Sequence, residues 1–179
     1  MSRFLLPLGV FALLAVVLAI GIQHAPEKGV IPSPLIGKPA PQFALPSLTD
    51  PASTVRSADL RGHWYLFNVW GTWCGECRAE HEMLLQVRRA GVLPLIGLDW
   101  KDDDAQARGW LTQLGDPYQA VAVDRSGRVA IDWGVYGAPE TFLVNPQGVV
   151  VYKHIGALTY ETWTREILPR VSSAAATRS

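Results

Sequence analysis

Apolar and polar positions along the chain mark regions of different character. Residues Phe4 to Ile22 form an uncharged run of roughly a bilayer's length as a helix, which predicts an N-terminal transmembrane anchor over residues 1–22. Prolines recur between residues 23 and 41 among small and polar side chains, as is typical of an extended spacer. Residues 42–170 alternate between apolar runs and amphipathic stretches and are expected to form one domain. The small and polar residues 171–179 predict a disordered tail.

Within residues 42–170, apolar runs bounded by turn residues predict strands, and apolar positions at helical spacing predict helices. The predicted strands cover residues 42–45, 64–70, 93–98, 121–123, 141–144 and 149–154, and the predicted helices cover residues 74–90, 102–114 and 159–168. Residues 126–137 show no regular pattern. The order strand, helix, strand, helix, strand, hairpin, helix predicts an α/β fold with a mixed central sheet flanked by helices.

The bulk composition limits the classes of function. An apolar content of 49 % over 179 residues suffices for one well-packed core. Lysine plus arginine and aspartate plus glutamate number 16 each, so the chain has no net field that would attract nucleic acid. We therefore expect no nucleic-acid partner, and we interpret most of the seven tryptophans as core residues.

The N-terminal apolar run has two interpretations. Its length favours an uncleaved anchor, whereas Ala19-Ile20-Gly21 offers a weak cleavage site for a signal peptide that is removed. Arg3 precedes the run, so the positive-inside rule keeps the N-terminus in the cytoplasm and sends the domain across the membrane. The domain is then expected in an oxidising compartment, where two cysteines form at most one disulfide.

Cys74 and Cys77 are the only cysteines, and their spacing closes too short a loop to staple a fold. Cys74 follows a predicted buried strand and opens a predicted helix, where unpaired N–H groups and the helix dipole favour a thiolate. Cys77 lies one turn further along, on the same side of the helix. The pattern predicts that Cys74 attacks a partner disulfide and that Cys77 resolves the mixed disulfide.

Metal binding is the alternative for this pair. A zinc site wants four ligands, but there is no second C-x-x-C, and no paired ligand spacing is found among His24, His63, His81 and His154. A Cu(I)-carrying module that uses the two sulfurs and a histidine such as His154 stays open, because soft thiolates suit Cu(I). In the preferred redox interpretation there is no metal and no cofactor beyond the Cys74–Cys77 disulfide.

Glu80 shares a helical stripe with Cys77, Leu84 and Val87, which predicts a carboxyl group on the apolar face behind the cysteines. Burial there would raise its pKa and let it exchange a proton with Cys77. The alternative is a side chain that extends to solvent. His81 has no such placement and is expected at the surface.

Three other features near the pair have structural as well as functional explanations. Trp73 is expected to shield the sulfurs and contact a partner, or else to fill the core. Asp102 to Asp104 are explained as helix-start acids rather than as a metal cluster. Pro139, between Ala138 and Glu140, is in isolation a turn proline with the usual trans bond.

These positions carry a resemblance to a known family. Trp73-Cys74-x-x-Cys77 at a strand-to-helix junction, with a later proline before a strand, resembles the thioredoxin fold. Five segments are similar to the CcmG/DsbE proteins of cytochrome c maturation: Asn68-Val-Trp-Gly-Thr-Trp-Cys74, Arg78-Ala-Glu-His81, Lys101-Asp-Asp103, Asp116-Pro-Tyr118 and above all Gly134-Val-Tyr-Gly-Ala-Pro-Glu-Thr-Phe142. The similarity covers about Gly37 to Pro169 and the N-terminal anchor.

The resemblance implies a thioredoxin-like reductase anchored in the inner membrane, with its domain in the periplasm. Its implied substrates are the heme-attachment cysteines of apocytochrome c, reached directly or through a partner dithiol protein, and its implied electron donor is a membrane thiol transporter of the DsbD/CcdA kind. The family pattern makes Cys74 the nucleophile, Cys77 the resolving thiol and Glu80 the acid near the buried sulfur. It also makes Pro139 a cis-proline facing the pair, in a substrate groove lined by Trp73, Tyr136, Ala138 and Glu140.

Two positions depart from the pattern. Asn68 replaces the buried aspartate of thioredoxin, which favours Glu80 as the proton acceptor. Gly75 and Glu76 stand between the cysteines, where the family usually carries a proline, and an acid close to Cys74 disfavours its thiolate. Besides a reductant for cytochrome c maturation, a general periplasmic thioredoxin-like reductase and a Cu(I)-binding adaptor are kept as hypotheses.

Overall fold

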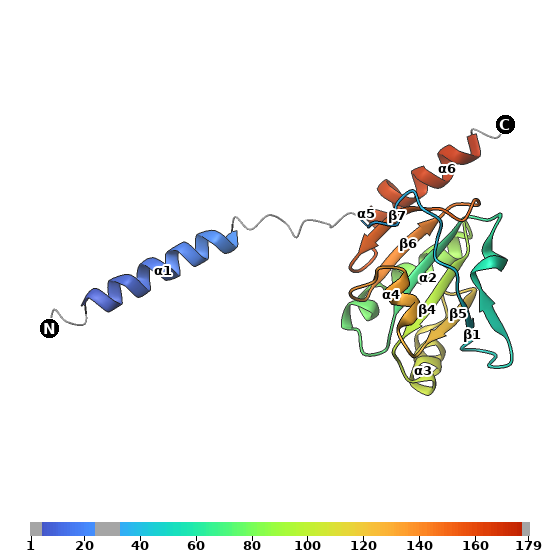
Figure 1. Cartoon of the computed structure of the whole chain (residues 1–179), viewed down its shortest axis with the longest axis horizontal. Helices are drawn as coiled ribbons and strands as arrows, with labels where there is room; N and C mark the ends of the chain where they lie inside the picture. The colour runs from blue at the N-terminus through green and yellow to red at the C-terminus, as the bar shows by residue number, and fades with distance from the viewer. Residues whose placement is uncertain (1–4, 24–32, 177–179) are drawn as a thin grey trace. The chain divides into compact units, whose positions relative to one another are not determined.

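The computed structural model describes residues 5–23 and 33–176, in two compact units of which the first ends at Ile31 and the second begins at Pro32 (Figure 1). The first unit contains helix α1 (Leu5–Gln23), which coincides with the predicted anchor run. Across the described part of the chain, no helix meets the length and apolar character that crossing a membrane requires.

The second unit contains every strand and helix predicted for residues 42–170, with most ends displaced by one or two residues. In chain order the elements are β1 (Ala44–Pro46), β2 (Thr54–Arg56), the 3-10 helix η2 (Ser57–Leu60), β3 (Tyr65–Trp70), α2 (Gly75–Ala90), β4 (Leu95–Trp100), α3 (Asp104–Leu114), β5 (Ala120–Asp124), α4 (Arg128–Asp132), β6 (Glu140–Val144), β7 (Val150–Ile155), α5 (Tyr160–Thr162), the π-helical turn η3 (Trp163–Ile167) and α6 (Leu168–Ala176).

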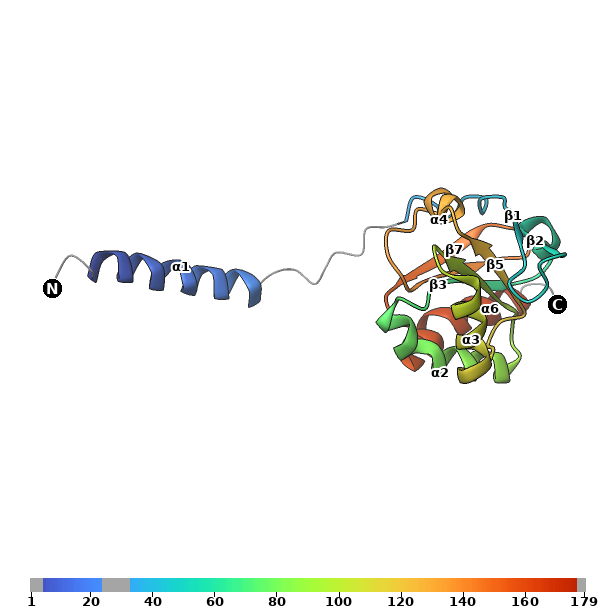
Figure 2. The ribbon, with the colours of Figure 1, turned by 90° about the horizontal axis from the view of Figure 1, so that it is seen from below.

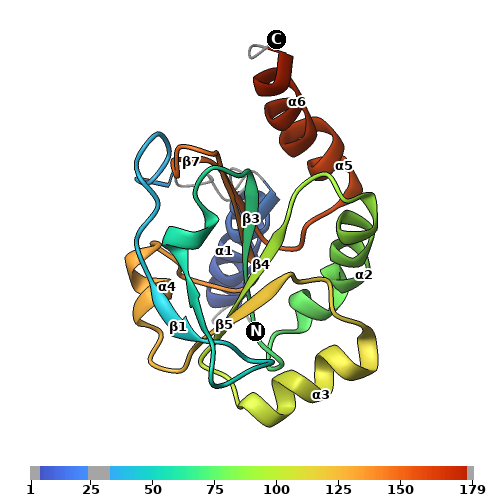
Figure 3. The ribbon, with the colours of Figure 1, turned by 90° about the vertical axis from the view of Figure 1, so that its right-hand side faces the viewer.

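Five strands form one mixed sheet in the order β5-β4-β3-β6-β7. β3 pairs in parallel with β4, and β4 with β5, whereas β6 runs antiparallel to both β3 and β7. All residues of the central strand β3 are buried, which explains its nearly continuous apolar sequence. Figures 2 and 3 show α2 and α3 on one face of the sheet and α4 on the other. The predicted mixed α/β architecture is confirmed.

Each face of the sheet has its own hydrophobic core. The core beneath α2 and α3 includes both cysteines and Trp70. The core on the α4 side centres on Phe67, whose ring stacks on Trp133 at a centroid distance of 4.1 Å. The buried tryptophans are Trp70, Trp110, Trp133 and Trp163, as expected of core residues.

The folded unit is longer at both ends than the sequence predicts. Gly37 donates its backbone N–H to Val150 at 2.8 Å, and Val150 donates in return to Lys38 at 3.0 Å, so residues 33–41 are part of the domain and not of a free spacer. At the C-terminus, α6 continues through Ala176, and the expectation of a disordered tail is wrong for residues 171–176, where alanines favour helix. Residues 24–32 of the predicted spacer and residues 177–179 of the predicted tail lie outside the described residues.

Helix α4 and strand β2 are among the short elements that were not predicted. Helix α4 occupies part of the segment expected to be irregular, and the N–H of Ala130 in this helix donates to Oδ2 of Asp124 at 2.9 Å. Strand β2 pairs antiparallel with β1. Elements of three to five residues are too short to establish a periodic pattern, which explains why sequence reasoning missed both.

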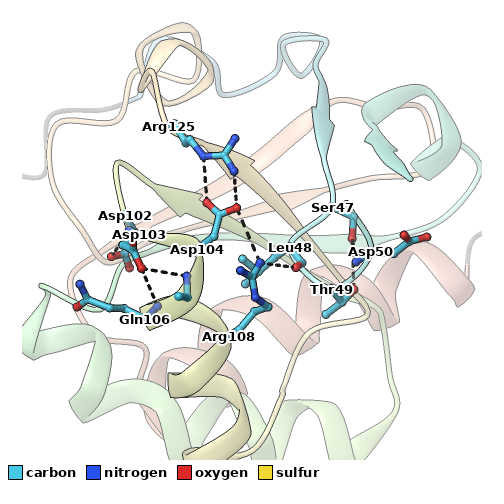
Figure 4. A network of polar contacts seen from close by, with 11 residues as sticks. Ser47, Leu48, Thr49, Asp50, Asp102, Asp103, Asp104, Gln106, Arg108 and Arg125 are labelled. Carbon is cyan, nitrogen blue, oxygen red and sulfur yellow. Dashed lines mark hydrogen bonds and ion pairs between the residues drawn. The ribbon is translucent and has the colours of Figure 1, made fainter. Parts of the chain in front are cut away.

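The N-terminus of α3 is fixed by carboxylates, as Figure 4 shows. Asp103 caps the helix by accepting from the N–H groups of Ala105 and Gln106, both at 3.0 Å. Asp104 forms ion pairs with Arg125, just after β5, and with Arg108 one turn along α3. The predicted helix-start role is therefore confirmed for Asp103 and Asp104, while Asp102 has a different partner in the candidate site.

Candidate active site

The cysteine pair lies where β3 leads into α2. Cys74 is the N-cap residue of α2 and is joined to Cys77 by a disulfide, with the two Cα atoms 5.3 Å apart. Its Sγ accepts a hydrogen bond from the backbone N–H of Cys77 at 3.0 Å. This N–H is one of the donors left unpaired at a helix N-terminus, so it stabilises negative charge on Sγ once the disulfide is reduced.

Trp73 is presented to solvent beside the disulfide. Its side chain is 54 % exposed, whereas Cys74 is 5 % exposed, and this excludes the alternative that Trp73 fills the core. The indole N–H donates to the carbonyl of Trp100 at 3.1 Å, and the two indole rings meet edge to face. The absence of a side chain at Gly71 makes this position of the indole possible, because a Cβ there would lie 2.5 Å from Nε1 of Trp73.

Glu80 lies on the buried face of α2, one turn beyond Cys77, as the stripe predicts. It is 1 % exposed, which excludes the alternative of a side chain that reaches solvent. Its Oε1 accepts from the amide of Asn68 at 2.9 Å, and its Oε2 accepts from the N–H of Leu158 at 2.6 Å. Burial raises the pKa of Glu80 to about 7, although these two hydrogen bonds act in the opposite direction. The carboxyl group can therefore gain or lose a proton near neutral pH.

Asn68 organises the polar groups around Glu80. Besides donating to Glu80, its amide donates to Oγ1 of Thr141 at 3.0 Å, and its Oδ1 accepts from the hydroxyl of Tyr118 at 2.8 Å. Gly97 gives Tyr118 the space for this contact, because a Cβ there would lie 3.1 Å from the tyrosine ring. The amide uses both donors and its acceptor within the core, so Asn68 orients Glu80 and has no proton of its own to exchange.

The segment before β6 leaves the sheet at the same edge as the loop before Cys74. Glu140, the first residue of β6, lies opposite Val69 near the end of β3. The Ala138–Pro139 bond is cis, as the resemblance implies, and Ala138 packs against the core cluster that contains both cysteines. The strand register therefore brings the start of β6 to the end of β3, from which the chain leads to Cys74.

Tyr136 and Glu140, both expected to line a groove, have different environments. Tyr136 is 60 % exposed, whereas the side chain of Glu140 is completely buried. The expectation that Glu140 lines an open groove is therefore wrong. Its carboxylate lies behind the segment instead, where it accepts from the N–H of Tyr136 at 3.3 Å and pairs with Lys153 at 2.8 Å.

The loop that precedes Cys74 is held by Asp102, a role that the sequence did not indicate. Asp102 accepts from both the backbone N–H and the hydroxyl of Thr72. Asp99, near the end of β4, is completely buried, and burial together with the charges of Asp102 and Asp104 raises its pKa to about 8. A carboxyl group with a pKa of about 8 is mostly protonated, and so uncharged, at neutral pH. The segment Lys101-Asp-Asp103 was the only sequence signal near Asp102, and Asp99 had none.

His81 is buried rather than at the surface, which corrects the sequence-based expectation. Its Nδ1 accepts from the indole N–H of Trp110 at 3.2 Å, and its Nε2 lies 2.9 Å from the carbonyl of Gly115. Nε2 therefore carries the proton and donates to that carbonyl. The side chain joins α2 to α3, and its partners lie too far along the chain for a local pattern to reveal them.

Among the described residues, histidines do not gather around the sulfurs. In residues 5–23 and 33–176, no three side chains of histidine, cysteine, aspartate or glutamate cluster closely enough to hold a metal ion. Nε2 of His154, the histidine considered above as a copper ligand, lies 3.2 Å from the carbonyl oxygen of Ala157. His24 falls outside the described residues.

Solved structures resemble this fold. The crystal structure of a Chlorobium tepidum protein assigned to DsbE superposes with a TM-score of 0.64 at 28 % identity and covers 78 % of this chain and 96 % of that one. A secreted thiol-disulfide isomerase from Corynebacterium glutamicum shares the fold, with a TM-score of 0.65 at 22 % identity over 74 % of this chain and 85 % of its own. The fold and the cysteine pair together define a thioredoxin-like thiol–disulfide oxidoreductase.

Sequence relatives place the chain more narrowly. The model of the AhpC/TSA family matches residues 36–153. The thiol:disulfide interchange protein DsbE of Allochromatium vinosum is 45 % identical over 171 residues, which cover 96 % of this chain and 93 % of the relative, and that of Pseudomonas aeruginosa is 45 % identical over 165 residues, which cover 92 % and 90 %. The chain belongs to the DsbE family of thiol:disulfide interchange proteins.

Proposed function

We propose that the chain is a membrane-anchored, periplasmic reductant of disulfides in cytochrome c maturation. The observation that carries this proposal is the segment Gly134–Phe142, which resembles the CcmG/DsbE proteins and contains the cis bond before Pro139. The substrates are then the heme-attachment cysteines of apocytochrome c, or a dithiol assembly protein that acts on them.

In the proposed cycle the reduced cysteine pair donates two electrons to the substrate. The thiolate of Cys74 attacks one sulfur of the substrate disulfide, which forms a mixed disulfide and releases the other sulfur as a thiolate. The thiolate of Cys77 then attacks Sγ of Cys74, the intermolecular bond breaks, and the Cys74–Cys77 disulfide closes. The substrate leaves as a dithiol, with two protons that come from the two thiols of the pair.

Glu80 exchanges the proton of Cys77 in this cycle. Because its pKa is raised to about 7, its carboxylate accepts the proton of the Cys77 thiol before Cys77 attacks. When the oxidised pair is reduced again, protonated Glu80 returns a proton to the sulfur that leaves. Residues three apart on a helix are neighbours, and Glu80 is held in place by Asn68 and Leu158.

The surface that contacts the substrate is formed by Trp73, Tyr136, Ala138 and Pro139, with Glu140 supporting it from behind. The exposure of Trp73 and Tyr136 supports this assignment, because large exposed aromatic side chains next to a reactive pair provide apolar contact area for a partner.

The membrane anchor is the uncharged run Phe4 to Ile22, and a single span there keeps the domain beside its inner-membrane partners. A membrane thiol transporter of the DsbD/CcdA kind is the proposed electron donor. No cofactor beyond the redox-active disulfide is needed, because thiol–disulfide exchange moves electrons between sulfurs alone.

The test is to trap the mixed disulfide. In the full-length Cys77→Ser variant the resolving thiol is missing, so we expect Cys74 to stay bound to apocytochrome c or to a cytochrome c assembly protein, which non-reducing electrophoresis and mass spectrometry identify. The double variant Cys74→Ser, Cys77→Ser is the control and traps nothing. If the trapped partners never include such proteins, the cytochrome c assignment fails and a general periplasmic reductase is favoured.

Two further measurements test the direction of electron transfer and the hypothesis that the pair binds copper. Thiol trapping in intact cells is expected to find the Cys74–Cys77 pair mostly reduced, and a mostly oxidised pair would argue against a reductant. Copper analysis of the purified protein tests the adaptor hypothesis: stoichiometric Cu(I) without disulfide reductase activity would replace the proposal.

A further inference from the structure

Lys153 is a buried cation on the strand next to the cis-proline segment. It lies on β7, where it pairs with Phe142 of β6. Its side chain is 4 % exposed, and its Nζ lies 2.8 Å from Oε2 of the completely buried Glu140. The steps of thiol–disulfide exchange described above give this ion pair no role.

The ion pair holds the segment between α4 and β6 at two points. Nζ of Lys153 donates to the carbonyl of Gly134 at 3.0 Å, and Oε1 of Glu140 accepts from the N–H of Tyr136 at 3.3 Å. The ammonium group also lies 4.7 Å from the centroid of the Tyr136 ring, within the range of a cation–π contact. Tyr136 is thus held both at its backbone N–H and at the face of its exposed ring.

The pair acts from the side of the sheet opposite Glu80. Glu140 and Thr141 are consecutive residues of β6, and consecutive side chains of a strand point to opposite faces. Thr141 accepts from Asn68 in the network around Glu80, whereas Glu140 lies on the face of Phe142 and α4. The sheet therefore separates Lys153 from the network around Glu80, and the polar contacts of Lys153 are with Glu140 and with the segment before β6.

A buried ion pair is weak grounds for a purely stabilising role, because desolvation of both charges offsets much of their attraction. The contacts of Lys153 converge instead on the segment that carries the exposed Tyr136 and leads through Ala138, which packs on the core cluster of the cysteines, to the cis bond before Pro139. We propose that Lys153 is a positioning residue that fixes this segment for contact with a disulfide-bearing polypeptide. The inference rests on the proposed contact surface and on thiol–disulfide exchange, and it does not depend on which polypeptide is the substrate.

The experiment compares Lys153→Met and Lys153→Arg with wild type in the full-length protein, with Lys38→Met, a substitution of an exposed lysine, as the control. The measurements are kcat and KM for a disulfide-linked peptide and for hydroxyethyl disulfide, together with the reduction potential against glutathione. We expect Lys153→Met to raise KM for the peptide roughly five- to tenfold while kcat stays within about twofold. Hydroxyethyl disulfide turnover and the potential are expected to be unchanged, and Lys153→Arg to recover part of the loss.

An unchanged peptide KM in Lys153→Met overturns the proposal. An equal loss with the peptide and with hydroxyethyl disulfide also overturns it, because that result marks a general structural defect. Should Lys153→Met fail to fold, Glu140→Gln is measured in the same way. This variant keeps an oxygen for the N–H of Tyr136 but removes the negative charge that Lys153 faces. An unchanged KM for the peptide in Glu140→Gln overturns the proposal too. The cytochrome c assignment is decided separately, by the identity of the trapped partners.

Discussion

The backbone N–H of Leu158 donates to Oε2 of Glu80 at 2.6 Å, across the interface between α2 and the loop that follows β7. With the amide of Asn68 on the other oxygen, the carboxylate has two donors that favour its charged form. Burial outweighs them, so the pKa of Glu80 still rises to about 7. A carboxyl group held in one orientation and poised near neutral pH is suited to exchange protons with the neighbouring Cys77.

Glu80→Gln tests this role in kinetics. Because a glutamine cannot exchange a proton, we expect the exchange steps that involve Cys77 to slow roughly ten- to hundredfold. The dependence of these rates on pH is expected to lose the limb near pH 7 that wild type shows. Stopped-flow measurement of tryptophan fluorescence, during reduction of the oxidised protein by a dithiol, follows these steps.

The control for this variant is Glu82→Gln, an exposed glutamate on the same helix that pairs with Arg89. Its rates and pH dependence are expected to match wild type. A wild-type pH profile in Glu80→Gln would show that another group carries the proton.

The raised pKa values also predict how stability depends on pH. Glu80 and Asp99 bind a proton more tightly in the folded state than in the unfolded state, so their contribution is full at low pH and is lost as pH rises through their folded pKa values. For Glu80 the change from 4.5 to about 7 corresponds to a loss of about 3 kcal/mol across that range. For Asp99 the loss continues to about pH 8.

Urea denaturation of the oxidised protein between pH 4 and 9 measures this loss. The free energy of unfolding of wild type is expected to fall across the range, that of Glu80→Gln to fall less up to about pH 7, and that of Asp99→Asn to fall less up to about pH 8. The slopes are compared rather than the absolute values, because each variant also loses local contacts. Parallel curves for wild type and both variants would contradict the assigned pKa values.

The cysteine pair and Glu80 were predictable because their signals are local. The spacing of Cys74 and Cys77 after an apolar strand places them at a helix start, and the stripe that Glu80 shares with Leu84 requires only the period of that helix. The prediction for the C-terminal tail was wrong although it also used a local signal. Its small and polar residues were interpreted as disordered, but three of them are alanines, which favour helix and continue α6.

The partners of these residues could not be predicted in the same way. Tyr118 and Leu158 reach Asn68 and Glu80 from 50 and 78 residues away in the sequence, and no local periodicity encodes such contacts. Glu140 illustrates the same limit, since its motif placed it at the surface while its burial depends on Lys153 on the neighbouring strand. Strand register and tertiary packing decide these positions.

Tyr118→Phe tests whether the Asn68 network stabilises the fold. The substitution leaves Oδ1 of Asn68 buried without the hydroxyl that now donates to it, and we expect a loss of about 1–3 kcal/mol in the free energy of unfolding. Urea denaturation at pH 7 measures it. Tyr160→Phe removes an exposed hydroxyl and is expected to change the stability very little. Equal stabilities of the two variants would mean that the Tyr118 hydroxyl contributes nothing measurable.

Glu76→Gln tests how the acid between the cysteines affects Cys74. Glu76 is an exposed carboxylate in the first turn of α2, where it opposes the negative charge that the helix N-terminus stabilises on Sγ. Its removal is expected to raise the thiolate fraction of Cys74 and to speed alkylation of the reduced protein by iodoacetamide at pH 7, roughly two- to threefold at low salt.

A more stable thiolate in Glu76→Gln also favours the reduced form, so the equilibrium with glutathione should move toward the dithiol. The effect should shrink in about 1 M salt, since exposed charges are screened there. If the alkylation rate at low salt equals that of wild type, Glu76 has no influence on the sulfur that attacks.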